Sequence, residues 1–184
     1  MKTKILCCLL IVLLLIACTS PTTRSSIEIP KLADYYETLM VEAQKWSADA
    51  YLYSVDFAVG EKKPWVLSAG FYSPTHDRES LEVILDLQMK ISQRRFSHQY
   101  EILLDEPILP AQWEIDSQDA LKILLSENQN TIDSIDVLCG SLKLSRVSIL
   151  PNRPLVWWLT YYECGTTDAH YAYMDPLTGE IITP

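Results

Sequence analysis

Residues 155–164 read Leu-Val-Trp-Trp-Leu-Thr-Tyr-Tyr-Glu-Cys, and this stretch decides the fold of the C-terminal half. Aromatic and β-branched residues favour a strand. Both alternating faces of that strand are apolar or aromatic, which predicts that both are covered. We expect one face to pack under a helix, whereas the other contacts the N-terminal half or forms an exposed aromatic patch. Trp158 and Tyr162, together with Tyr72 of the N-terminal half, are the candidate partner-binding residues.

The segments on either side of this strand predict the same order of elements in both halves. Apolar residues at three- and four-residue steps predict helices, and clusters of turn residues separate the predicted strands. The helix of the first half should cover 34–52 with Asp34 as its N-cap, and strands should follow at 53–59, 65–72 and 81–91. The helix of the second half should begin after Asp116 and end before the breaker-rich segment 126–130, with strands at 134–148, 155–164, 170–174 and 180–183.

The two halves can be aligned with each other. Pro64 matches Pro154 at an offset of 90 (154 minus 64), and Asp86 matches Asp175 at an offset of 89 (175 minus 86). This indicates an internal duplication, with coincidence between two generic segments as the alternative. The predicted fold class is α+β, with helix-plus-antiparallel-sheet modules at 31–92 and 116–184. The connection at 93–115 has room for an extra strand.

Three segments of the second half carry a family resemblance. They are Asp119-Ala-Leu-Lys-Ile123 in the helix, Val156-Trp-Trp-Leu-Thr-Tyr161, and the closing Tyr171-Ala-Tyr-Met-Asp-Pro-Leu-Thr-Gly-Glu-Ile181. This half resembles PepSY and PepSY-like domains, whose last strand typically ends in an Asp-x-x-Thr-Gly-Glu turn. The first half lacks the Thr-Gly turn after Asp86. The resemblance implies a non-enzymatic protein that binds, inhibits or chaperones another exported protein, without family-wide catalytic residues.

The turn that begins at Asp175 can also be interpreted from its residues alone. Asp at the first position, Pro next and Gly where φ must be positive make a tight turn. We predict that the Asp175 side chain caps backbone amides. A metal-binding or partner-binding carboxylate is the alternative.

The N-terminal residues are typical of an exported protein. A basic start with Lys2 and Lys4 precedes an apolar run, 5–16, that is shorter than the roughly 20 residues needed to span a bilayer. This pattern predicts a signal peptide at 1–17. Leu15-Ile-Ala-Cys18 resembles the lipobox of bacterial lipoproteins, which implies fatty acyl chains such as palmitate on Cys18. An ordinary cleaved signal or an uncleaved anchor is the alternative, and 18–30 reads as a polar tether.

The charge of the chain excludes some partners. The whole chain has 15 basic and 24 acidic residues. The leader contains two lysines and no acidic residue, so its removal leaves 13 basic (15 minus 2) against 24 acidic residues. Such an acidic surface repels phosphates, which argues against nucleic acid and direct docking on anionic lipid. His76, His98 and His170 show no metal-ligand spacing, so neither a metal site nor a cofactor is predicted. The oligomeric state does not follow from the sequence.

Cys139 and Cys164 form a candidate disulfide, because an exported compartment favours oxidation of paired cysteines. If the neighbouring strands form a hairpin around 150–153, the numbers of facing residues add up to 303. Because 139 plus 164 is 303, the two cysteines would lie directly opposite each other. The alternative, a cysteine nucleophile, has no local histidine partner in the sequence.

These patterns together predict a non-enzymatic lipoprotein of the cell envelope that binds or inhibits another exported protein, such as a peptidase. Its lipid anchor would hold it in the cell membrane or outer membrane, facing the periplasm or the exterior. One alternative is a ligand-binding or assembly lipoprotein that uses an aromatic groove for a small molecule or glycan. Another is a hydrolase with unrecognised carboxylates, because acidic residues are plentiful but dispersed.

Overall fold

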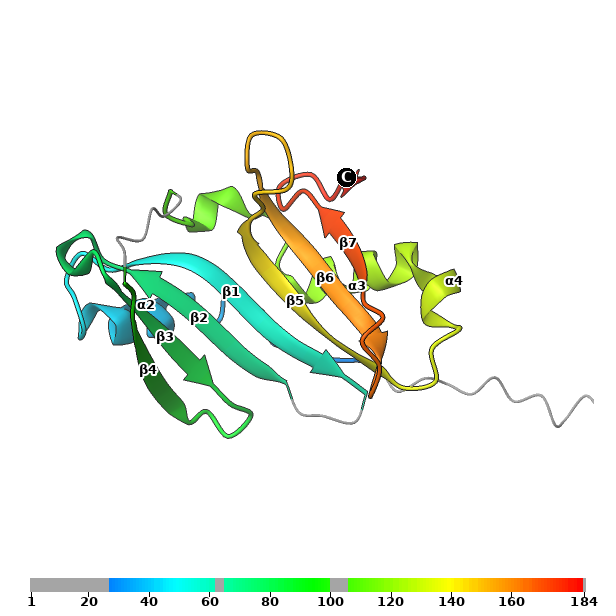
Figure 1. The fold of residues 1–184 in the computed structure, drawn as a ribbon, viewed down its shortest axis with the longest axis horizontal. Coiled ribbons are helices and arrows are strands. Elements are labelled where there is room, and N and C mark those ends of the chain that lie inside the picture. The colour runs from blue at the N-terminus through cyan, green and yellow to red at the C-terminus, as the bar shows by residue number, and fades with distance from the viewer. Residues whose placement is uncertain (1–26, 62–64, 100–105, 184) are drawn as a thin grey trace, which may run out of the picture.

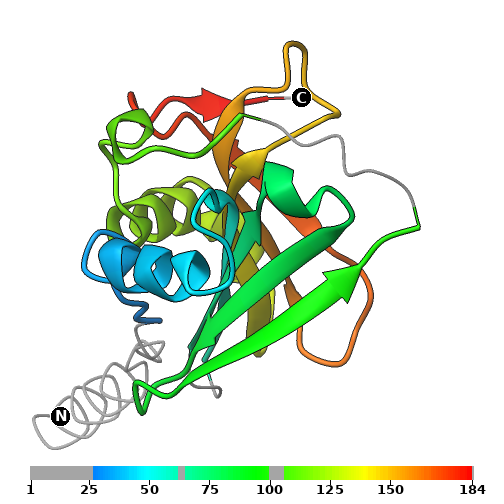
Figure 2. The same ribbon diagram turned by 90° about the vertical axis from the view of Figure 1, so that its left-hand side faces the viewer.

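The computed structural model describes residues 27–61, 65–99 and 106–183. The strands form one antiparallel sheet in the order β4-β3-β2-β1-β5-β6-β7-β8 (Figure 1). Helices α2 and α3 lie on the same face of this sheet (Figure 2). Cys18 and the predicted signal peptide lie outside the described residues. No helix in these described ranges is both long and apolar enough to cross a membrane.

The elements follow the same order in both halves, and β1 and β5 join the halves edge to edge. The first half contains α2 (Tyr36–Gln44), β1 (Tyr51–Gly60), β2 (Val66–Tyr72), the 3₁₀ helix η1 (Pro74–His76), β3 (Glu79–Leu85) and β4 (Ile91–Ser97). A connection with the 3₁₀ helix η2 (Pro110–Gln112) leads to the second half. That half contains α3 (Ser117–Glu127), α4 (Gln129–Ile132), β5 (Leu138–Arg146), β6 (Leu155–Glu163), β7 (His170–Met174) and β8 (Ile181–Ile182).

The first helix is shorter than the predicted range 34–52. It ends at Gln44, and the Ser47 hydroxyl then donates to the Asp49 carboxylate at 2.6 Å, while the Ala50 amide donates to the Ser47 carbonyl at 3.1 Å. Serine and aspartate side chains that bond locally compete with helical hydrogen bonds. The predicted N-cap Asp34 was wrong, because Tyr35 occupies that position and makes no side-chain cap.

The third strand of the first half differs from the prediction, because the strand expected at 81–91 ends at Leu85 and a turn follows it. β4 is the extra strand for which the connection had room, although it begins at Ile91. The second helix ends within the segment 126–130, as predicted, because α3 stops at Glu127; a short further helix, α4, then begins at Gln129, and its Ile132 is only 3% exposed. The predicted start of α3 is confirmed, since the Asp116 carboxylate accepts a hydrogen bond from the Ser117 amide.

The main core lies between the helices and one face of the sheet. Leu39 of α2 and Leu124 of α3 are buried there with Phe57 of β1 and Trp157 of β6. Trp157 also donates its indole N–H to the Ile115 carbonyl at 2.8 Å. Burial of each such large apolar side chain stabilises the fold by roughly 1.5–3 kcal/mol.

The hydrogen-bond registers of the two halves are equivalent. Phe57 pairs with Leu67 in the first half, and Leu144 pairs with Trp157 in the second. The first strands are therefore 87 positions apart (144 minus 57) and the second strands 90 (157 minus 67). The third strands differ by 89 (174 minus 85), so the last two values agree with the sequence offsets. Asp56 pairs with Lys143, its own equivalent, which places a local twofold axis between them.

Candidate functional site

The face of the sheet opposite α2 and α3 carries a row of polar and aromatic side chains at its centre. Neighbouring strands pair Ser68 with Asp56, Asp56 with Lys143, Lys143 with Trp158, and Trp158 with Tyr173. We call these five residues the central row and this side of the sheet the open face. The labelled helices lie behind this face in Figure 1. The central row therefore crosses both halves and is the best candidate for a functional site.

A shallow cleft lies on the first-half side of the central row. Its volume is about 150 Å³, and its lining includes Tyr53, Asp56, Gly70, Glu82 and Lys143. Pockets for drug-sized ligands usually measure roughly 300–1,000 Å³. The cleft therefore fits a side chain or a small polar group better than a whole small molecule or glycan.

A bulge in β1 builds one wall of this cleft. The pairing of β1 with β2 shifts between Leu52 and Ser54, so Tyr53 is the extra residue. A Cβ at Gly70 would lie 2.8 Å from Cζ of Tyr53 and 2.6 Å from Oγ of Ser54. Glycine is therefore required at position 70 for the tyrosine ring to lie against the sheet. Burial raises the pKa of the Tyr53 hydroxyl, which keeps it neutral and able to donate a hydrogen bond.

Two carboxyl groups share the cleft in different surroundings. Burial raises the pKa of Asp56, and the charge of Glu82 adds to this effect, whereas the Lys143 ammonium opposes it. Glu82 accepts a hydrogen bond from the Ser68 hydroxyl at 2.5 Å and lies 3.8 Å from the Arg94 guanidinium. The cleft thus presents an ammonium, two carboxyls and a phenol, which together can bind a polar side chain.

The second-half side of the central row is aromatic. Trp158 stacks on Tyr173 with ring centroids 6.0 Å apart, and the Lys143 ammonium lies 5.5 Å from the Trp158 ring centroid. A cation over an indole face is attracted by the ring quadrupole. Val147, Leu150 and Val156 complete a small second core around these rings. Trp158 is therefore half-buried, and its indole N–H has no hydrogen-bond partner among the described residues.

The sheet does not bring the three predicted partner-binding residues together. Trp158 lies in the central row, but Tyr162 lies beside Cys139 near one end of β6. Tyr72 packs edge-on against Tyr51 at the end of β2, with centroids 5.5 Å apart. All three lie on the open face and are half-buried. The two halves form one continuous sheet, so the second face of β6 does not pack against the first half; the 147–150 segment covers part of it.

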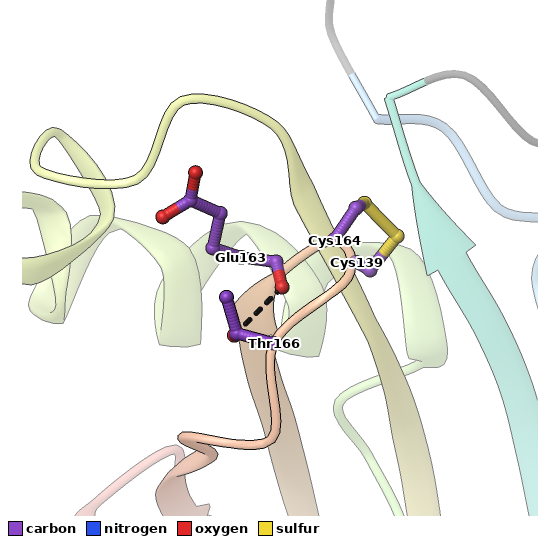
Figure 3. Close-up of a disulfide and its surroundings, with 4 residues drawn as sticks. All are labelled: Cys139, Glu163, Cys164 and Thr166. Carbon is purple, nitrogen blue, oxygen red and sulfur yellow. Dashed lines mark hydrogen bonds between the residues drawn. A yellow bond between two sulfur atoms is a disulfide. The ribbon is translucent and has the colours of Figure 1, made fainter.

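The predicted disulfide between Cys139 and Cys164 is present, with Cα atoms 5.1 Å apart (Figure 3). The predicted register was wrong by two residues. Cys139 faces Tyr162, so facing residue numbers total 301, and Cys164 lies one residue beyond β6. Its amide donates to the Val137 carbonyl at 2.8 Å. The hairpin closes between Val147 and Pro154, with Asn152 and Arg153 at positive φ, and this turn sets the register.

The prediction missed Asp56 and Lys143, although the charges of these two residues stand out in the sequence. Asp56 is the single charge in the predicted strand 53–59, and Lys143 is one of three charges in the predicted strand 134–148, with Asp136 and Arg146. A charge in a mostly apolar strand marks a position that faces water or a partner. Their pairing depends on the register between halves, which the sequence does not specify.

The comparisons with known proteins support the fold. No family model matches this chain, and no curated protein matches it. Among solved structures, the chain is similar to the crystal structure of a protein described as "a putative lipoprotein" from Clostridium difficile 630. The sequences are 12% identical, the TM-score is 0.58, and the match covers 86% of this chain and 93% of that chain. At this identity the likeness concerns the α+β fold alone.

Proposed function

We propose that this protein is a lipid-anchored lipoprotein of the cell envelope that binds and restrains another exported protein, such as a peptidase. The lipobox-like segment ending at Cys18 supports the anchor, and the description of the structural neighbour agrees with it. The resemblance of 116–184 to PepSY domains supports the choice of an exported protein as the partner. The acidic composition fits a protein partner better than nucleic acid.

The observation that carries this proposal is the difference in side-chain exposure between the two faces of the sheet. Phe57 and Trp157 on the helix-covered face are 0% exposed. Lys143, Trp158 and Thr160 on the open face are half-buried. A mixture of aromatic anchors and polar groups on one surface is typical of protein interfaces. The central row would therefore lie at the middle of the contact.

A pair of arginine insertions tests the proposal. The full chain, purified with its lipid in detergent micelles, is titrated into exported peptidases of the same organism, and peptidase activity is measured. Thr160→Arg places a charge beside the central row, because Thr160 lies two residues from Trp158 on the same face of β6. Val41→Arg places the same charge on α2, where Val41 is 52% exposed.

We expect the wild type and Val41→Arg to inhibit a peptidase equally and Thr160→Arg to lose inhibition. Equal inhibition by both variants would exclude the open face as the contact. Absence of inhibition and binding by the wild type would exclude the proposed partner class. Labelled palmitate that reaches a Cys18→Ala variant as well as the wild type would exclude the anchor.

A further inference from the structure

The two edges of the sheet differ. At one edge, β8 contains only Ile181 and Ile182. At the other edge, β4 has seven residues, and 92–97 are all exposed. Short strands are one way in which proteins protect sheet edges from pairing with another chain. The β8 edge is protected in this way, whereas the β4 edge is long enough to pair with a further strand (Figure 1).

The direction of the β4 backbone groups follows from the bonds at both ends of its pairing with β3. The Asp86 amide donates to the Lys90 carbonyl at 3.3 Å, and the His98 amide donates to the Arg78 carbonyl at 2.7 Å. Hydrogen-bonded and non-hydrogen-bonded pairs alternate along an antiparallel ladder. Even-numbered residues of β4 therefore bond to β3, and the odd-numbered residues 91, 93, 95 and 97 direct their N–H and C=O groups away from the sheet.

Nothing in β4 interrupts this outward row of donors and acceptors. The pairing of β3 with β4 continues without a register shift from Glu79 opposite Ser97 to Leu85 opposite Ile91. The sequence Ile91-Ser-Gln-Arg-Arg-Phe-Ser97 contains no proline. Bulges and prolines are two of the devices that prevent strand addition, and charged side chains on the edge strand are another.

The charge of β4 is opposite to that of the whole protein. The chain has a formal net charge of −9, yet β4 contains two arginines and no acidic residue. Glu82 lies 3.8 Å from Arg94, a group that is 68% exposed. Glu42 of α2 accepts a hydrogen bond from Gln93 and is paired with Lys45. Arg95 has no ion pair among the described residues, and β4 of a second copy would bring like charges to the seam.

We propose that β4 accepts an extended, acidic segment of a partner protein as a ninth strand. Main-chain hydrogen bonds to residues 93 and 95 would provide affinity, and acidic side chains beside Arg94 and Arg95 would provide selectivity. This inference rests on the proposed function, because it states the form and charge of the partner segment that the anchored protein binds.

A matched pair of substitutions at one position tests the backbone contact. Gln93→Pro removes an outward N–H that β3 does not use, and Gln93→Thr removes the same side chain but keeps that N–H. The full chain in detergent micelles is titrated with a fluorescent synthetic peptide that alternates glutamate with valine, and anisotropy is recorded. A peptide that alternates lysine with valine is the charge control.

The wild type and Gln93→Thr should bind the glutamate peptide, and Gln93→Pro should bind at least about tenfold more weakly. Arg95→Glu, which keeps every backbone group, should transfer the preference to the lysine peptide. Equal binding by Gln93→Pro and Gln93→Thr would overturn strand addition. An unchanged preference in Arg95→Glu would overturn the assignment of an acidic partner.

Two further results separate this inference from the proposed function. Self-association of the free chain that Gln93→Pro abolishes, without peptide binding, would show that a second copy occupies the edge and would overturn the inference. Thr160→Arg should still bind the glutamate peptide, because its site is on the open face and not at the edge. Inhibition of a peptidase that Gln93→Pro leaves unchanged would overturn strand addition and leave the proposed function standing.

Discussion

The β3–β4 and β7–β8 turns are both capped by an aspartate at their start, but their surroundings differ. The Asp86 carboxylate accepts hydrogen bonds from the amides of Gln88 and Lys90 at 2.9 and 3.0 Å. The Asp175 carboxylate accepts from the amides of Leu177 and Thr178 at 2.8 and 2.9 Å, as predicted. Near the end of each turn one residue has positive φ: Met89 at 61° and Gly179 at 76°.

The surroundings explain why only one of the two residues is glycine. Pro176 of the second turn accepts hydrogen bonds from the amides of Glu114 and Ile115, so this turn is docked on the connection. A Cβ at Gly179 would lie 2.8 Å from Cδ1 of Ile115. The first turn projects into solvent, and Met89 is 53% exposed. Left-handed backbone alone is compatible with methionine at some energetic cost, whereas left-handed backbone under a packed side chain requires glycine.

The comparison extends to the halves themselves. The second half is fastened by the connection, by the disulfide and by the small core around Trp158. The first half ends in the exposed strand β4. We therefore expect the second half to be the more stable scaffold and the first half to provide the accessible edge.

The largest effect should come from the equivalent core residues Trp157 and Leu67. Trp157→Ala should lower the free energy of unfolding by about 3–5 kcal/mol, measured by urea denaturation. Leu67→Ala should cost less, at about 3 kcal/mol, because leucine is the smaller side chain and because only Trp157 also bonds to the connection through Ile115. Equal losses would contradict the view that the second half is fastened through this contact.

Loss of the disulfide should have the next largest effect. The cross-link joins residues 25 positions apart, so the double variant Cys139→Ser, Cys164→Ser should lose about 3 kcal/mol in the chain-entropy model. Hydrogen exchange should accelerate in β5 and β6 more than in β3 and β4. The wild type in reductant is the control and should match the variant. Uniform acceleration across the sheet would show that the two halves open as one unit.

Substitutions at Met89 and Gly179, which both have left-handed backbone, should change the free energy of unfolding in opposite directions. Gly179→Ala should lower the free energy of unfolding by about 1–2 kcal/mol, because both φ and Ile115 oppose a Cβ. Met89→Gly should raise it by about 0.5 kcal/mol, since relief of left-handed strain exceeds the entropy of glycine. Met89→Ala retains the Cβ and should give no gain. Destabilisation by Met89→Gly would mean that the methionine makes a contact that matters.

The smallest effect should come from Asp56, at the junction of the halves. Burial raises its pKa above the ordinary value of 3.8, so the stability contributed by the protonated form is present below 3.8 and is lost as pH rises through the folded pKa. Asp56→Asn should therefore gain stability relative to the wild type between about pH 3 and pH 7, by less than about 1 kcal/mol. Lys143→Met should enlarge the wild-type loss. A variant difference that does not change with pH would contradict a raised pKa.

Local patterns in the sequence predicted many of the elements. β7 occupies the predicted residues 170–174, and Asp116 and Asp175 make the predicted backbone caps. The disulfide was also predicted, although from the wrong register. These features depend on periodicity, on capping side chains and on the chemistry of single residues, all of which act over a few positions along the chain.

Only the tertiary structure decided how the halves combine. The pairing of Asp56 with Lys143, the single sheet and the open face depend on contacts between strands more than 80 positions apart (143 minus 56 gives 87). A two-residue change of register leaves every side chain on the same face. The alternation of side chains therefore could not distinguish the observed register of the β5–β6 hairpin, in which facing residue numbers total 301, from the predicted register, in which they total 303. The turn at 147–154 and the bulge at Tyr53 set the registers instead. The sequence by itself thus determined which side chains share a face of each strand, and the packed turns determined which residues meet across neighbouring strands.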